Sequence, residues 1–201
     1  QGYVSNMTYD ATGEYFKTSL MNYSLGGAFN SRINLNLRED KGWTYGARSG
    51  FSGNDRGSQF TASAGIKASA TDSAVVEFIK EIKGFQEDGI TKDELNFMRN
   101  SIGQRDARRY ETPFQKAGFL GNIIRYDLDG SYVDKQADII QNITREEINA
   151  LAKKYLNTEN TYILVVGDGA TNRDKLKALG YEVIDVTEKG DIIEPIQEGS
   201  E

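Results

Sequence analysis

Alternating apolar and polar residues mark the two ends of this chain, and helical patterns fill its middle. The alternation predicts a strand over residues 2–9. Residues 44–67 are rich in Gly, Ser, Thr and aromatic residues, and they predict a β-hairpin that turns at residues 54–57. Two short apolar runs later in the chain, residues 161–166 and 181–186, predict two further strands.

Apolar residues at helical spacing occupy most of the remaining chain. A first helix is predicted from a cap at Thr12 to the glycine pair at residues 26–27, and a short second helix over residues 31–40. A capping box, in which threonine precedes glutamate by three residues, marks two of the later helix starts. The predicted starts of the later helices are Thr71 or Asp72, Thr91, Thr112, Val133, Thr144 and Arg173.

The order of these elements predicts the fold class. Strands that flank a helical middle indicate one α+β domain over residues 1–186, with a largely antiparallel sheet and helices packed on one of its faces. The acidic segment at residues 187–201 is predicted to be a flexible tail. Because the chain opens with Gln1 rather than methionine, we expect it to be a piece of a longer protein.

The 201 residues include neither histidine nor cysteine, which excludes several kinds of site. Catalytic zinc normally rests on imidazole or thiolate ligands, so we expect no metal site of that kind in this chain. Serine and cysteine hydrolase triads need histidine as well. The net charge of −6 disfavours nucleic acid as a partner. No apolar run reaches the roughly 20 residues of a membrane span. The arginines Arg105, Arg108 and Arg109 cluster on one predicted helix and are expected to form a solvated face.

One segment, LGGAFNSRINLNLREDKGWTYGA at residues 25–47, carries a possible chemical signal. Its paired glycines permit a close backbone approach that any side chain would block. Arg38 and Tyr45 stand at the two ends of the predicted connection from helix to strand. A guanidinium and a phenolic hydroxyl placed there can converge on one carbonyl oxygen or oxyanion. The alternative is that Arg38 is a surface ion-pair residue and Tyr45 a core aromatic.

The stretch LGGAFNSRINLNLREDKGWTYGARS closely resembles the signature of the second homologous domain in peptidase family M16, the pitrilysin, insulinase and mitochondrial processing peptidase group. The resemblance continues through ITKDELNFMRNSI, ITREEINALAKKYLN and YILVVGD, and it covers about residues 1–185. It implies a single M16-type domain of the LuxS/MPP-like kind. The glycine-to-tyrosine stretch is specific, whereas the later pieces are weak individually and fall in the family's order.

The resemblance also implies a function. Family members enclose a chamber between two similarly folded halves, one of which carries an HxxEH motif, binds Zn²⁺ and activates water. This chain would be the other half, without a cofactor of its own, closing the chamber around peptide substrates and inactive alone. By motif, Arg38 and Tyr45 would contact the substrate and the charge that develops on the attacked carbonyl. Gly26, Gly27 and Phe29 are candidate substrate-binding residues in the same segment.

A binding role is the alternative to a zinc metalloendopeptidase. Some relatives in this family have lost catalysis and serve as partner or scaffold subunits, so this chain could be a catalytically inactive M16-like subunit. An HxxEH motif in upstream sequence or in a separate partner subunit would favour the peptidase. A bacterial periplasmic or envelope location is expected if an upstream signal peptide has been removed.

Overall fold

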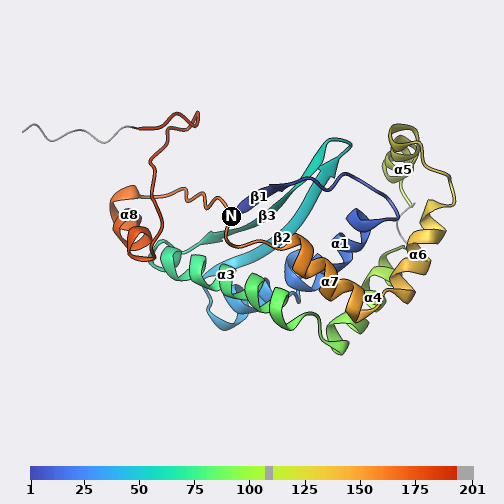
Figure 1. Cartoon of the computed structure of the whole chain (residues 1–201), viewed down its shortest axis with the longest axis horizontal. Coiled ribbons are helices and arrows are strands. Elements are labelled where there is room, and N and C mark those ends of the chain that lie inside the picture. Colours follow the sequence, from blue (N-terminus) through green and yellow to red (C-terminus); the bar gives the residue numbers. More distant parts are fainter. Residues whose placement is uncertain (107–110, 194–201) are drawn as a thin grey trace, which may run out of the picture.

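The computed structural model describes residues 1–106 and 111–193, drawn as ribbons in Figure 1. Helices make up most of this part, and most of them start within two residues of the predicted position, but the last begins at Gly169, four residues before the predicted Arg173. The helical elements are α1 (Glu14–Asn22), η1 (Tyr23–Gly27), α2 (Arg32–Asn34), η2 (Leu35–Asp40), η3 (Ala68–Ala70), α3 (Thr71–Asp88), α4 (Lys92–Asp106), α5 (Pro113–Tyr126), α6 (Tyr132–Asn142), α7 (Arg145–Tyr155) and α8 (Gly169–Ala178). Outside the described part lie Arg108, Arg109, the side chain of Arg105 and residues 194–201.

The strands of the described residues form an antiparallel sheet. β1 (Gly2–Ser5), β2 (Thr44–Asn54) and β3 (Gly57–Ile66) lie in the order β1-β3-β2, so that β3 is central. β2 and β3 make the predicted hairpin, which turns at residues 54–57. Aromatic residues stack across all three strands, since Phe60 of β3 lies opposite residues of both neighbouring strands.

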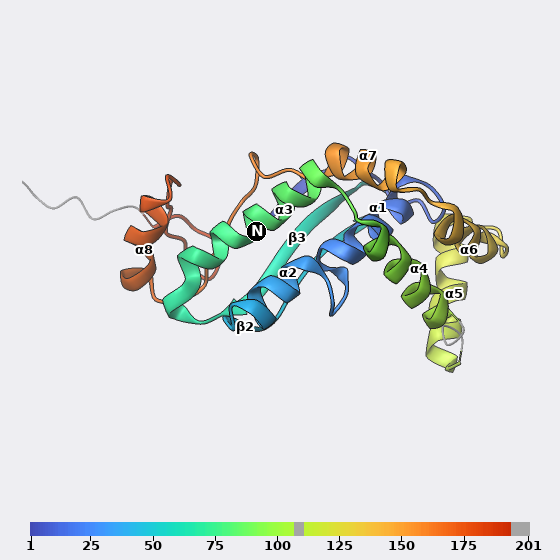
Figure 2. The ribbon, with the colours of Figure 1, turned by 90° about the horizontal axis from the view of Figure 1, so that it is seen from below.

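The sheet has one buried and one exposed face. Along β3, Phe60 and Ala62 are buried whereas Thr61 and Ser63 are exposed, as the two-residue period of a strand requires. Figure 2 shows α1, α2 and α3 lying across the buried face. The prediction of an α+β fold with an antiparallel sheet and helices on one face is therefore confirmed. The core between these layers includes Leu20, Met21, Leu25, Ile33, Leu37, Ile82, Phe85, Ile90, Met98 and Ile148.

Local signals fix the starts of several helices. Thr91 and Glu94 form the predicted capping box, in which each side chain accepts the other residue's backbone N–H. The box predicted at Thr144 forms with Glu147 in the same way. Thr112 caps α5 directly before the proline at its first position.

Two boundaries near the start of the chain differ from the prediction. The first strand ends at Ser5, and the first helix begins at Glu14 rather than after a cap at Thr12. The cause is Asp10, whose Oδ1 accepts the backbone N–H of Thr12 at 2.9 Å. This Asx-type turn holds the chain in a bend between the strand and the helix.

The strand predicted over residues 161–166 forms a single bridge, and the rest of that prediction is wrong. Gly2 and Tyr162 exchange two backbone hydrogen bonds of 2.9 Å. In this antiparallel register Ile163 is the next residue and falls opposite Gln1. No strand of the described residues lies beside residues 164–166. A strand needs a neighbouring backbone to satisfy its polar groups, and the local apolar pattern does not reveal whether one is there.

The strand predicted over residues 181–186 is also wrong apart from one bridge, between Val186 and Ile192. The chain turns back there, because Thr187 donates its backbone N–H to the carbonyl of Asp191 at 2.8 Å. The first residues of the predicted tail are thus folded into a short turn against the preceding segment.

Candidate functional site

Arg38 lies in the last turn of η2, with about one third of its side chain exposed (33%). Its guanidinium stacks on the ring of Phe29, with 4.4 Å from the Cζ atom to the ring centroid. Nη1 also donates to Oε1 of the adjacent Glu39 at 2.8 Å. The stack orients the guanidinium on one side, and about one third of the side chain remains exposed to solvent.

Tyr45 is the second residue of β2, and its side chain is fully exposed. The pairing of β2 with β3 is irregular between Thr44 and Ala47. The Thr44 hydroxyl accepts the backbone N–H of Gly46 at 3.0 Å and donates to its carbonyl at 2.9 Å, which stabilises the irregularity. Bulges of this kind re-aim a side chain out of the regular ladder, and here the side chain is that of Tyr45.

A groove of about 460 Å³ lies near these two residues, but neither of them lines it: Tyr45 directly precedes the lining residue Gly46, and Arg38 stacks on the lining residue Phe29. It brings together Gly26, Gly27 and Phe29, the three candidate substrate-binding residues, with the strand that carries Tyr45. The other lining residues are Ala28, Asn34, Gly46, Ala47, Arg48, Ser63, Ala64 and Gly65.

Two buried asparagines connect this groove to the sheet. Asn34 donates from Nδ2 to the carbonyl of Phe29 at 2.7 Å, and its Oδ1 accepts the backbone N–H of Ala47 at 2.8 Å. Asn22 donates to the carbonyl of Ser49 at 2.8 Å. Both side chains therefore make hydrogen bonds with backbone groups on the outer edge of β2, as a further strand would.

Sequence analysis missed these asparagines and Arg48, which is exposed on β2 at the rim of the groove. For Arg48 the period of two along the strand offered a signal, because it alternates with the buried Ala47 and Ser49. For Asn34 the local pattern offered no such signal, since an asparagine within a predicted helix is usually interpreted as a polar surface residue.

Packing accounts for the first glycine of the pair. Gly26 is buried in η1 against β2. A Cβ atom at this position would lie 2.6 Å from the backbone nitrogen of Ser49 and would also overlap its hydroxyl. Gly26 thus permits the contact between η1 and β2 that shapes one wall of the groove.

We expect Gly26→Ala to lower the free energy of unfolding by about 2–3 kcal/mol, because the added methyl group forces η1 away from β2. Urea denaturation of both proteins measures the change. Gly50→Ala is the matched control, since Gly50 lies on β2, the strand that Gly26 contacts, and open space surrounds it. Equal stability of the Gly26 variant and wild type would show that the contact is not tight.

An ion pair holds the start of this segment against the helices. Arg32 Nε and Nη2 donate to the two carboxylate oxygens of Glu94 at 2.6 and 2.8 Å, and Nη2 also donates to the carbonyl of Gly89 at 2.8 Å. Burial raises the pKa of Glu94, but the hydrogen bonds from Arg32 and Thr91 outweigh it, so that this pKa lies below its usual value. The pair fixes α2 to α4, and α2 carries Asn34 of the groove.

The described residues offer no cluster of three or more metal-ligating side chains. The whole sequence lacks histidine and cysteine, so the imidazole and thiolate donors on which catalytic zinc usually rests are missing from this chain. Within the described part, no helix is both long and apolar enough to cross a bilayer. The groove is lined mainly by glycine and alanine together with Phe29, Asn34, Arg48 and Ser63, and the guanidinium of Arg38 and the phenol of Tyr45 belong to residues next to this lining.

Comparison with known proteins gives a consistent result. The family model described as "Peptidase M16 inactive domain" matches residues 2–102. A solved structure of a peptidase M16 inactive domain from Pseudomonas fluorescens is similar over 78% of this chain and 38% of its own, with 25% identity and a TM-score of 0.68. No curated protein matches the sequence significantly.

Two further solved structures share the fold. A protease from Helicobacter pylori is similar over 78% of this chain and 37% of its own, with 18% identity and a TM-score of 0.65. The inactive peptidase domain of a proposed zinc protease from Bordetella parapertussis is similar over 79% of this chain and 86% of its own, with 15% identity and a TM-score of 0.61. The chain thus spans a little over a third of the Pseudomonas and Helicobacter chains.

Proposed function

Since the chain belongs to the peptidase M16 inactive-domain family, we propose that it is the non-catalytic half of a zinc metalloendopeptidase, with Arg38 and Tyr45 facing a zinc site held by another domain or subunit. The observation that carries this proposal is the pair itself. The exposed Tyr45 directly precedes one residue that lines the groove, the guanidinium of Arg38 stacks on another, and the chain lacks histidine and cysteine. Residues 1–186 would act as one domain in this role.

The zinc would be held by an HxxEH-bearing partner, where it would supply an activated water. The residues of this chain would act on the other side of the peptide bond. The Arg38 guanidinium and the Tyr45 hydroxyl would donate hydrogen bonds to the carbonyl oxygen under attack. Both would stabilise the negative charge on that oxygen as it develops, because donors aimed at a developing charge lower the barrier.

The exposed face of the sheet supports a role as a chamber wall. Next to the groove it carries small or polar residues, among them Gly46, Ser63 and Gly65, while the helices cover the opposite face. Such a face leaves room for a peptide to lie across it. The blocked edge of β2, where Asn22 and Asn34 take the bonding positions, directs a substrate to the face rather than to that edge.

Reconstitution tests the proposal. We expect the isolated chain to contain no stoichiometric zinc by elemental analysis and to cleave no peptide. Co-expression with an HxxEH-bearing M16 domain encoded in the same genome is expected to give a complex that hydrolyses unfolded peptides. The same partner with the glutamate of HxxEH changed to glutamine is the control.

Tightly bound zinc in the isolated chain would contradict the division of labour. A stable complex with no hydrolysis of any peptide would instead favour the binding or scaffold subunit, and the peptidase proposal would be wrong.

A further inference from the structure

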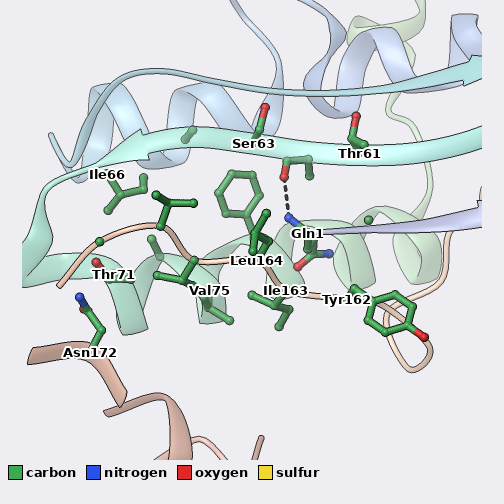
Figure 3. Close-up of a pocket in the computed structure, with 18 of the residues that line it drawn as sticks. Gln1, Thr61, Ser63, Ile66, Thr71, Val75, Tyr162, Ile163, Leu164 and Asn172 are labelled. Atoms are coloured by element: carbon green, nitrogen blue, oxygen red, sulfur yellow. Dashed lines mark hydrogen bonds between the residues drawn. The ribbon is translucent and has the colours of Figure 1, made fainter. Parts of the chain in front are cut away.

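The sheet is almost free of charged side chains. β1, β2 and β3 together contain one charged residue, Arg48, although 27% of the whole chain is charged. Arg48 lies on β2 opposite Ser63 of β3, and both side chains are exposed. The residues on either side of Arg48 along β2 are buried, as the alternation of a strand requires. In Figure 3 the side chain of Ser63 points away from Val75 of α3, so Arg48 stands on the face that the helices leave open.

Of the described residues that line the groove of about 460 Å³, Arg48 alone is charged. Within the part of the chain that the structure describes, its side chain forms no hydrogen bond or ion pair, whereas the nearby Arg38 is paired with Glu39. Arginine stays protonated at neutral pH and offers five hydrogen-bond donors. The groove therefore presents a positive charge that no carboxylate of the described residues neutralises.

Two glycines lie beside this charge on the same face of the sheet. Gly50 is two residues from Arg48 on β2, and Gly65 is two residues from Ser63 on β3. No positive φ requires glycine at either position, and an added Cβ atom would meet no atom within 4 Å. Glycine inside a strand weakens the strand, and it often marks a place where a ligand or another backbone approaches closely. The glycines thus leave open space next to the unpaired guanidinium.

We propose that the groove is a subsite for an acidic side chain of the peptide substrate, with Arg48 as the residue that determines this specificity. The guanidinium donates two parallel hydrogen bonds to the carboxylate, a geometry that arginine matches and lysine does not. The space beside Gly50 and Gly65 accommodates the peptide backbone. The inference rests on the proposed function, since it takes the groove as part of the substrate site.

The position of Arg48 relative to Tyr45 determines where the acidic residue lies in the substrate. The two residues are three positions apart on β2, so roughly 10 Å separates them at about 3.3 Å per residue. An extended peptide covers the same length in about three residues. With the attacked carbonyl at Tyr45, the acidic residue lies within about three residues of the cleaved bond. The carboxylate is that of a glutamate or aspartate side chain, because an endopeptidase cleaves an internal bond.

The test uses the 201-residue chain reconstituted with its HxxEH-bearing partner, and peptides with uncharged reporter groups. Mass spectrometry first identifies the bond that is cleaved in a neutral parent peptide, acetylated and amidated at its ends. Glutamate or glutamine is then placed in turn at each of the three residues on either side of that bond, so that glutamate brings the only carboxylate. We expect glutamate to raise kcat/KM about tenfold over glutamine at one of these positions, the effect of one charge-assisted hydrogen bond.

Variants of the protein assign this preference to one side chain. Arg48→Gln is expected to lower the ratio of kcat/KM between the glutamate and glutamine peptides from about ten to about one. Arg48→Glu reverses the charge and is expected to favour lysine at the same peptide position. Arg56→Gln is the matched control, because it removes an exposed arginine from the turn of the same hairpin, outside the groove lining. Its ratio is expected to stay at about ten.

A binding measurement separates the subsite from the peptidase function. The same peptides, labelled with an uncharged fluorophore, are titrated with the 201-residue chain alone and followed by fluorescence anisotropy. We expect the glutamate peptide to bind about tenfold more tightly than the glutamine peptide, and Arg48→Gln to remove this difference. This readout needs neither zinc nor hydrolysis.

The two readouts distinguish the possible failures. Hydrolysis with equal kcat/KM for every glutamate and glutamine pair would overturn the subsite and leave the proposed function standing. If no peptide is hydrolysed, the peptidase function is wrong and the binding ratio decides about the subsite. Equal binding of the two peptides, or a preference for glutamate that persists in Arg48→Gln, would overturn it.

Discussion

In the proposed peptidase complex, Tyr45→Phe and Arg38→Ala are each expected to lower kcat/KM about 10²–10³-fold, because each would remove one proposed donor to the developing oxyanion. Tyr45→Phe deletes only a hydroxyl group from a fully exposed side chain. The fall is expected mainly in kcat, since the charge on the attacked oxygen is greatest in the transition state. Steady-state hydrolysis of a fluorogenic peptide measures both constants.

Neither change is expected to disturb the fold. Tyr45 stands outside the core, and Arg38 contributes a stack on Phe29 that is worth about 0.5–1 kcal/mol at an exposed site. Zinc content and the free energy of unfolding are therefore expected to stay close to wild type. The loss of activity would then reflect the missing donors rather than misfolding.

Matched controls separate this site from general surface effects. Tyr181→Phe removes a phenolic hydroxyl near the end of α8, and Lys80→Ala removes an exposed cation from α3. Both are expected to leave kcat/KM unchanged. If Tyr45→Phe and Arg38→Ala behave like these controls, the assigned role of the pair is wrong, even though the family membership stands.

Glu94→Ala is expected to lower the free energy of unfolding by about 3 kcal/mol, because it leaves the guanidinium of Arg32 partly buried without its carboxylate. Three quarters or more of both side chains are shielded, since their exposed fractions are 22% for Arg32 and 25% for Glu94. The substitution also removes the capping box of α4. Urea denaturation at pH 7 measures the loss.

The pH dependence of stability provides a second test of the same pair. The pKa of Glu94 is lower in the folded than in the unfolded chain, so its ionised form stabilises the fold above the unfolded pKa. That contribution is lost as the pH falls through the folded pKa. We expect wild type to lose stability more steeply than Glu94→Ala below about pH 4.3, the usual pKa of a glutamate.

An exposed ion pair is the control for Glu94. Lys17 and Glu147 lie 3.0 Å apart with exposed fractions of 31% and 44%. Lys17→Ala is expected to cost less than about 1 kcal/mol, since water already solvates both groups. A similar small loss for Glu94→Ala would mean that the Arg32 pair contributes no more than a surface contact.

Local features of this chain followed from its sequence. The capping boxes at Thr91 and Thr144 and the hairpin turn at residues 54–57 all depend on residues within a few positions of one another. Because each signal depends only on residues close together in the sequence, it predicts the local structure independently of how the rest of the chain folds.

The site was only partly visible in the sequence. Arg38 and Tyr45 were singled out by a family resemblance, and their spacing alone left a surface ion-pair residue and a core aromatic as an open alternative. The structure supplies the stack on Phe29, which is nine residues away, and the bulge that turns Tyr45 outward. The clamp by Asn34 depends on Ala47, thirteen residues along the chain.

The sequence by itself determined where helices begin, where the hairpin turns, and that zinc cannot be held by imidazole or thiolate here. Only the tertiary structure decided whether an apolar run becomes a strand and which polar side chains are buried. The run at residues 161–166 has a strand's composition, yet within the described residues it forms one bridge, between Tyr162 and Gly2. A helix completes its own backbone hydrogen bonds, whereas a strand depends on a neighbouring strand that the local sequence does not reveal.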